Sequence, residues 1–324
     1  MNKKESILLI LDIFREYSDE DHVLSTGDII DLVESSSGLR LDRRTVYANI
    51  EMLRDYGYSI SDYQTEGRGY YLADRRFDEG EVLLLANAIH ANHFISRAES
   101  ERMINTLLGE LSKYQQRSYR ENVYKPNPRK RSNKELLRSI KACSKAINEG
   151  RQIAFVYLEY DMNKELKPRR EKLYIVEPRY IVYDDARPYL VTTSERHPGY
   201  IHYRLDRMSN VRVLRDPVRR IPKSRDSYEY AKDKLYMFAG ETMTAMIRCR
   251  KAKLDQVIDQ FGTGVRIMDE DEDHFLAWVQ STESGLLFLA QQNMDYMEIV
   301  EPEALRDKMK ERLRETLAKY EKNS

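Results

Sequence analysis

The chain has 324 residues, of which 41% are hydrophobic and 33% are charged, a composition suited to about two to four folded domains with well-solvated surfaces. Its 54 basic and 54 acidic residues balance, so any basic segment must be offset by acidic segments elsewhere. No apolar run has the length of a membrane span, and the two cysteines are far apart, which excludes a disulfide framework and predicts a cytoplasmic protein.

Residues 1–73 carry the pattern of three short helices followed by a hairpin. Apolar side chains recur at helical spacing from residue 7 to 14, again from 29 to 33, and a third time from 46 to 53. Residues 58–72 then read as two extended segments around a polar, glycine-containing turn. This order predicts a winged helix-turn-helix, whose third helix enters the major groove of DNA.

The third helix and the hairpin tip supply the candidate DNA-binding residues, which are Arg43, Arg44, Thr45, Tyr47, Asn49 and Arg68. The arginines can reach phosphates or guanine, and Asn49 supplies an amide if its side chain faces the groove. Residues 1–75 nevertheless contain 9 basic and 15 acidic residues. A winged helix used for protein contacts therefore stays open as an alternative.

Residues 74–133 are predicted to form a helical connector that ends in a proline-containing linker. Helical spacing predicts one helix over 79–91 and a second over 98–114. His90 and His93 have no cysteine or acidic residue nearby at metal-ligand spacing, so we expect no metal site there. Such an arm is suited to joining two copies of the chain.

Residues 134–225 are predicted to form a helix followed by a small closed or half-closed β-barrel. The extended segments, rich in β-branched and aromatic residues, are 153–157, 172–176, 180–183, 189–192 and 200–205. Residues 129–225 contain 24 basic and 12 acidic residues, a net charge of +12. Cations and aromatic faces together favour an anionic ligand, although a solvated basic surface would look the same.

Two sets of residues carry a family resemblance. Pro178, then Tyr189-Leu190, then the run 203–207 (Tyr-Arg-Leu-Asp-Arg) resemble the WYL domain, with Pro188 where the family has tryptophan. The segments 43–47 and 67–72 resemble the helix-turn-helix that precedes such domains. The resemblance implies an Sm-like or SH3-like barrel that senses a ligand within a bacterial transcription regulator.

The resemblance also implies a ligand surface formed by Tyr157, Tyr189, Arg204 and Arg207. Strand alternation adds His202, which shares a face with Arg204 if Tyr203 packs inward. Two alternatives stay open: Tyr189 can be an ordinary core residue, and Arg207 can simply pair with a neighbouring aspartate.

Residues 235–320 show a β-α-β-β-α-β order, which predicts a ferredoxin-like domain. It resembles the extension that follows WYL domains. The acidic turn 269–273 lacks the spacing of a calcium loop, so a solvated hairpin is the preferred interpretation.

The sequence thus predicts a multidomain α+β protein with four parts: a winged helix (1–73), a connector (74–133), a WYL domain (134–225) and a ferredoxin-like extension (235–320). We expect a ligand-responsive, homodimeric transcription regulator that binds an operator in double-stranded DNA and senses a nucleotide or a short single-stranded nucleic acid. No Walker A loop, Rossmann fingerprint or nucleophile elbow is present, so we expect neither enzymatic activity nor a cofactor or metal. The alternative is a nucleic-acid-processing enzyme or a nucleic-acid-binding interaction protein.

Overall fold

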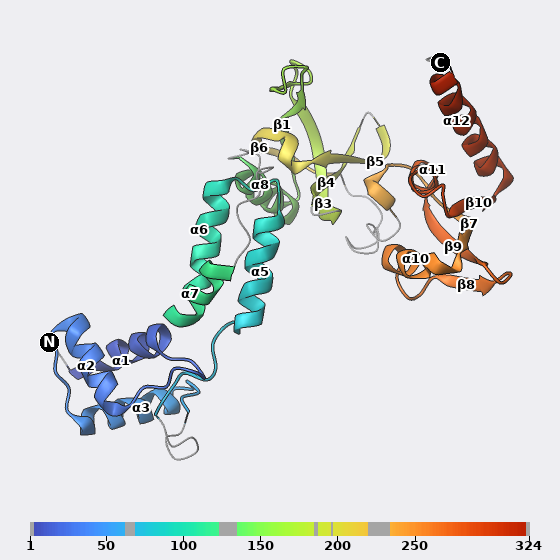
Figure 1. Cartoon of the computed structure of the whole chain (residues 1–324). Coiled ribbons are helices and arrows are strands. Elements are labelled where there is room, and N and C mark those ends of the chain that lie inside the picture. Colours follow the sequence, from blue (N-terminus) through green and yellow to red (C-terminus); the bar gives the residue numbers. More distant parts are fainter. Residues whose placement is uncertain are drawn as a thin grey trace. The chain divides into compact units, whose positions relative to one another are not determined.

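The computed structural model describes residues 3–61, 69–122, 135–184, 187–195, 197–219 and 234–321. The chain divides into two compact units, Met1–Lys134 and Glu135–Ser324 (Figure 1). Within the described ranges, no helix is both long enough and apolar enough to cross a membrane.

The first unit opens with three helices packed around one apolar core. They are α1 (Lys3–Tyr17), α2 (Thr26–Ser37) and α3 (Arg43–Asp55). Ser25 begins α2 through a reciprocal capping box with Asp28, and Gly38 ends it with φ of 72°. One β-bridge joins Ile60 to Leu72 across the two sides of the predicted hairpin, and a second joins Tyr70 to Leu24, which lies between α1 and α2. The three expected helices are present, and residues 59–61 pair with 71–73 as the two sides of the expected hairpin, whose turn lies outside the described residues.

The same unit continues into a helical connector made of α5 (Glu79–Ala91), α6 (Arg97–Leu108) and α7 (Lys113–Asn122). The prediction of one helix over 98–114 was wrong in its second half. The chain turns after Gly109, and Ser112 begins the next helix because its hydroxyl accepts the backbone N–H of Gln115 at 3.1 Å. Apolar side chains of α5, α6 and α7 share a small core.

The second unit opens with α8 (Leu136–Glu149) and a strongly curved antiparallel sheet. Its strands are β1 (Arg151–Tyr160), β2 (Leu166–Pro168), β3 (Tyr174–Asp184), β4 (Arg187–Ser194), β5 (His197–Arg204) and β6 (Met208–Pro217). The pairing runs β2-β1-β3-β4-β5, and β6 also pairs with β1.

The predicted barrel is not closed over the residues that the structure describes. The chain leaves β5 through the single 3₁₀ turn η1 (Leu205–Arg207), and β6 then pairs with β1 and not with β5. Among the described strands, β5 pairs with β4 alone.

The rest of the second unit is a four-stranded antiparallel sheet covered by helices on one face. Its elements are η2 (Leu235–Met237), β7 (Thr242–Arg250), η3 (Lys251–Lys253), α10 (Leu254–Phe261), β8 (Arg266–Asp269), β9 (His274–Thr282), α11 (Glu283–Gln292), β10 (Met297–Glu301) and α12 (Glu303–Glu321). The strand order β10-β7-β9-β8 agrees with the predicted ferredoxin-like topology. The described chain is an α+β protein with antiparallel sheets.

Candidate functional sites

The first turn of α3 presents two exposed arginine side chains. Asp42 caps the helix: its carboxylate accepts the backbone N–H of Thr45 at 2.9 Å and the Thr45 hydroxyl at 2.8 Å. These bonds lower the pKa of Asp42, the backbone N–H contributing most. Arg43 and Arg44 follow the cap directly and are exposed. The capped turn thus holds both arginines at the helix end that a winged helix turns toward DNA.

The other predicted DNA-binding residues have different surroundings. Tyr47 is exposed, and its hydroxyl lies 3.4 Å from the hydroxyl of Thr26. Asn49 does not face outward, because it is 3% exposed and its side-chain amide donates to the Ser6 hydroxyl at 2.9 Å. Asn49 was expected to contact DNA only if its side chain faced the major groove, and a buried side chain cannot do so. Arg68 lies outside the described residues.

The structure brings Tyr157, Arg204 and Arg207 together in the WYL-like sheet. The Tyr157 hydroxyl accepts the backbone N–H of Arg204 at 3.3 Å. Burial raises the pKa of Tyr157, so the hydroxyl stays protonated. Its ring packs edge-on against Tyr203, with centroids 5.2 Å apart, within a cluster that also contains Phe155 and Tyr174.

Asp206 separates the roles of the two arginines. It is 4% exposed and receives two hydrogen bonds from the Arg204 guanidinium, at 2.9 and 2.8 Å. Burial lowers the pKa of Arg204, but the bonds to Asp206 outweigh it and leave that pKa raised. The Nε of Arg207 lies 3.9 Å from Asp206, so Arg207 also forms an ion pair with this aspartate, as the alternative interpretation expected, but at a distance too long for a hydrogen bond. Within the described part of the chain, this buried Nε meets no acceptor.

The guanidinium group of Arg207 packs against an aromatic ring. Its guanidinium carbon lies 4.4 Å from the ring centroid of Tyr160, a cation–π geometry. The sequence did not single out Tyr160, because strand alternation puts residues three apart on opposite faces and so gave no signal that it joins this site. One carboxylate and two guanidinium groups leave this corner with a net positive charge.

Tyr189 and His202 lie on the same face of the sheet as Arg204. Both side chains pack between this sheet and η2. Tyr189 pairs with Arg204 across the β4–β5 ladder and packs against the buried cluster of Val182, Val191 and Met237. The Nδ1 of His202 donates to the Met237 carbonyl at 2.7 Å, and burial lowers the pKa of this imidazole. Both side chains are thereby engaged in holding η2 against the sheet.

Sequence reasoning missed a buried ion network around Glu177, which is 2% exposed. Arg179 donates to one carboxylate oxygen at 3.0 Å, and Arg219 donates to the other at 2.9 Å. The Thr193 hydroxyl adds a bond of 2.7 Å. This network ties the chain after β6 to the β3–β4 ladder. A lone acid between apolar strand residues was its sequence signal.

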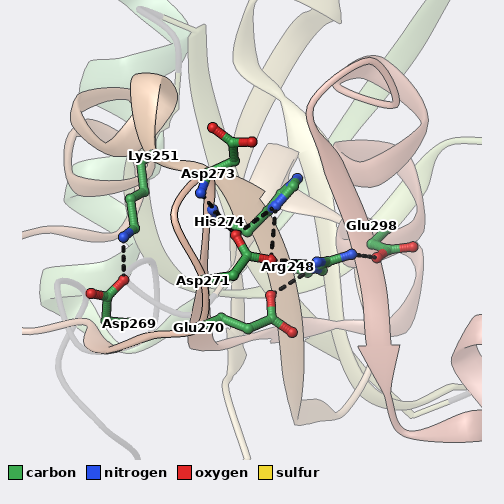
Figure 2. Close-up of polar contacts among 8 residues, drawn as sticks. All are labelled: Arg248, Lys251, Asp269, Glu270, Asp271, Asp273, His274 and Glu298. Carbon is green, nitrogen blue, oxygen red and sulfur yellow. Dashed lines mark hydrogen bonds and ion pairs between the residues drawn. The ribbon is translucent and has the colours of Figure 1, made fainter.

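The acidic turn of the ferredoxin-like domain is occupied by its own partners (Figure 2). Arg248 donates to Glu270 at 2.6 Å and to Asp271 at 2.9 Å, and Lys251 pairs with Asp269 at 2.5 Å. Asp271 also accepts the backbone N–H of Asp273, which is the largest cause of its lowered pKa of about 2. Within the described ranges, no group of three or more histidines, cysteines or carboxylates is arranged to hold a metal.

Comparison with known proteins bears on the sheet that carries these arginines. Residues 138–213 match the model of the WYL domain. The chain carries a WYL domain. This match spans α8 and the strands β1 to β5, together with most of β6, so the Arg204–Arg207 corner belongs to the WYL domain. No curated protein sequence matches the chain.

Two solved structures resemble the chain at low similarity. Proteasome accessory factor B/C (PafBC) of Arthrobacter aurescens is 17% identical with a TM-score of 0.27, and the match covers 98% of this chain and 49% of that one. A CRISPR Cas-related protein is 12% identical with a TM-score of 0.34, covering 81% and 77% of the two chains. The chain spans about half the length of PafBC.

Proposed function

We propose that the protein is a ligand-responsive, DNA-binding transcription regulator that acts as a homodimer in the cytoplasm. One observation carries the proposal: Arg43 and Arg44 are exposed on the capped first turn of α3, which packs in a three-helix core, in a chain that also carries a WYL domain. The three-helix domain supplies a DNA-reading surface, and the WYL domain supplies a sensor.

The DNA contact rests on the first half of α3. Arg43 and Arg44 can each make paired hydrogen bonds to guanine or bind phosphate, and the Tyr47 hydroxyl can reach the adjacent backbone. Thr45 contributes by fixing the helix end, because Asp42 engages its hydroxyl. Asn49 has no part in readout, since it is buried. Two such helices related by a twofold axis would match half-sites about one or two helical turns of DNA apart.

The proposed ligand is an anion, a nucleotide or a short single strand. Two hydrogen bonds to Asp206 engage the Arg204 guanidinium, whereas Arg207 lies 3.9 Å from Asp206, so Arg207 is the guanidinium better placed to donate to a phosphate. Tyr160 beside it offers a ring on which a base can stack, a contribution of about 1–3 kcal/mol per base. The positive charge of the segment 129–225 favours the same class of ligand.

A mobility-shift assay tests the proposed function. The probe is the DNA upstream of the protein's own gene, and a fragment of equal length from within the coding region is the control. We expect preferential binding of the upstream fragment, and a change in that binding when short single-stranded oligonucleotides are added. Equal, weak binding to both fragments at all salt concentrations would contradict sequence-specific recognition.

A further inference from the structure

The buried stripe of α3 defines which of its side chains point outward. The buried residues of this helix are Val46, Asn49, Ile50 and Leu53. At 100° per residue they occupy one side of the helix, and the direction opposite their centre falls within about 10° of Arg44 and about 30° of Ala48. Both residues are exposed. Arg44 and Ala48 thus lie one turn apart on the outward side of α3.

The neighbours of Ala48 limit what can approach this side of the helix. Tyr47 is turned toward α2, since its hydroxyl lies 3.4 Å from that of Thr26. Glu51 and Asp55 continue the outward side beyond Ala48, and Arg54 pairs with Glu51 at 2.7 Å. Phosphates along the groove repel carboxylates, so these two acids oppose insertion of the second half of α3. A DNA duplex would therefore meet the first two turns, which contain Arg44 and Ala48.

We propose that Ala48 reads the 5-methyl group of a thymine in the major groove, close to a guanine contacted by Arg44. This inference rests on the proposed function and names a base that the operator must contain. The side chain of Ala48 is a methyl group, which neither donates nor accepts a hydrogen bond. Thymine presents an apolar group in the major groove, its C5-methyl, and alanine is among the residues that contact it.

The helix rise sets the distance between the two bases. Ala48 follows Arg44 by four residues, which is about 6 Å along the helix axis. Successive bases of a strand are about 3.4 Å apart, so the thymine should lie about one or two base pairs from the guanine. A contact through a methyl group also requires the backbone of α3 to come close to the base edges. The short side chain of Ala48 permits that approach.

Replacement of single bases tests the proposal on the full chain. The protein first enriches its preferred duplex from a library of random sequence. Each thymine of the enriched half-site is then replaced by uracil, which lacks only the 5-methyl group, and binding is measured by fluorescence anisotropy. We expect one replacement, about one or two base pairs from a guanine, to weaken binding about fourfold, the effect of losing one methyl-sized apolar contact. Unchanged affinity at every replaced thymine overturns the proposal.

Ala48→Gly assigns the effect to this residue. The variant lacks the methyl group, so it should bind the thymine and uracil duplexes equally. Ala88→Gly is the matched control, because it makes the same helix-weakening change at an exposed alanine of α5 and should keep the fourfold difference. Each protein is compared on two duplexes, so a general loss of affinity does not alter the result. A difference that persists in Ala48→Gly refutes the contact by Ala48.

A longer side chain at the same position gives a second readout. Glutamine pairs with N6 and N7 of adenine, so we expect Ala48→Gln to select adenine where the unaltered protein selects thymine and to keep the neighbouring guanine. Selection of the same base at every position would show that Ala48 faces no base, which overturns the proposal. If the unaltered protein enriches no sequence, the proposed DNA-binding function fails and this inference fails with it. An enriched sequence without a thymine-methyl effect refutes this inference alone.

Discussion

Arg44 stands exposed at the first turn of α3, where DNA would approach. We expect Arg44→Ala to weaken operator binding by about 1–3 kcal/mol, since a paired contact to guanine is lost. Fluorescence anisotropy with a labelled operator measures the change. Arg40→Ala is the control, because Arg40 is also exposed and its guanidinium is paired with Glu34 at 2.9 Å. Wild-type affinity in both Arg43→Ala and Arg44→Ala, with folding intact, would exclude readout by α3.

Glu177 gives the WYL domain a pH-dependent stability. Burial raises its pKa, but hydrogen bonds from Arg219 and Thr193 outweigh burial and lower it from 4.5 to about 2. A carboxyl with a lowered folded-state pKa stabilises the protein above its unfolded-state pKa and loses that contribution as the pH falls through the folded-state value. The contribution is therefore complete above about pH 4.5 and disappears toward pH 2.

We accordingly expect Glu177→Gln to lower the free energy of unfolding by about 3 kcal/mol at neutral pH, because two arginines lose a buried partner. Urea unfolding followed at neutral pH and at several acidic pH values measures this. The difference from the unaltered protein should shrink as the pH falls below about 4.5. Glu298→Gln, which removes an exposed acid 3.5 Å from Arg248, is the control and should change stability little. A difference that does not vary with pH would contradict this assignment.

Residue periodicity anticipated some of these placements and not others. Asn49 follows Val46 by three residues and precedes Leu53 by four, so helical spacing alone put it on the inward face. Its partner Ser6 is 43 residues away, and a pair this distant in sequence leaves no local signal. Arg204 forms hydrogen bonds with Asp206 and Arg207 does not. This difference likewise depends on the orientation of the Asp206 side chain, which the order of residues does not determine.

At the scale of secondary-structure elements, segments with a strong apolar periodicity were predicted well, and segments rich in charged residues were not. The helices of the three-helix domain, the strands β1, β4 and β5, and the ferredoxin-like order agree with the expectation, whereas the segments 172–176 and 180–183, predicted as two strands, form the single strand β3. The sequence did not predict the strand β6. Only Met208 is buried in this strand, and its polar and charged residues lie along the edge of the sheet. Pairing with β1 makes this segment a strand, and that pairing is a tertiary interaction.

Arg54 is a second element-scale feature, since it fixes the hairpin against α3. Its guanidinium donates to the carbonyls of Ile60 at 3.2 Å and Ser61 at 2.6 Å. We expect Arg54→Ala to cost about 1.5–3 kcal/mol locally, because charged hydrogen bonds are lost. Amide hydrogen exchange should then accelerate at Ser61 and Ala73, whose N–H groups bond across the hairpin to Tyr71 and Ser59. Unchanged exchange at both amides would show that the hairpin is held without Arg54.

Charge is unevenly distributed over the whole molecule. Residues 129–225 carry a net charge of +12, while residues 1–75 and 226–324 each carry −6. If residues 1–75 read an operator as proposed, their net negative charge limits non-specific attraction to DNA and leaves selection to the exposed arginines of α3. The basic WYL domain, in contrast, attracts anions through its overall field. The proposed operator and the proposed ligand would thus bind to parts of the chain that have opposite net charges.

Regulation requires that the ligand favour one state of the molecule over another, since equal binding to both states shifts nothing. If an oligonucleotide changes operator affinity by some factor, operator DNA must change oligonucleotide affinity by the same factor. We expect this reciprocity in the unaltered protein. Anisotropy titrations with labelled operator, and separately with labelled oligonucleotide, measure the two factors.

Arg207→Ala is the decisive variant for that coupling, because it leaves the Arg204–Asp206 pair intact. We expect this variant to bring both factors to one, so that the oligonucleotide no longer changes operator affinity and the operator no longer changes oligonucleotide affinity. Operator affinity without ligand should stay near that of the unaltered protein. Arg212→Ala is the control, since Arg212 is an exposed arginine on β6 and its loss changes the net charge equally. If Arg207→Ala responds to the oligonucleotide as the unaltered protein does, the sensor site lies elsewhere. If Arg212→Ala abolishes the response as well, only the overall charge of the WYL domain matters, and the specific role of Arg207 is refuted.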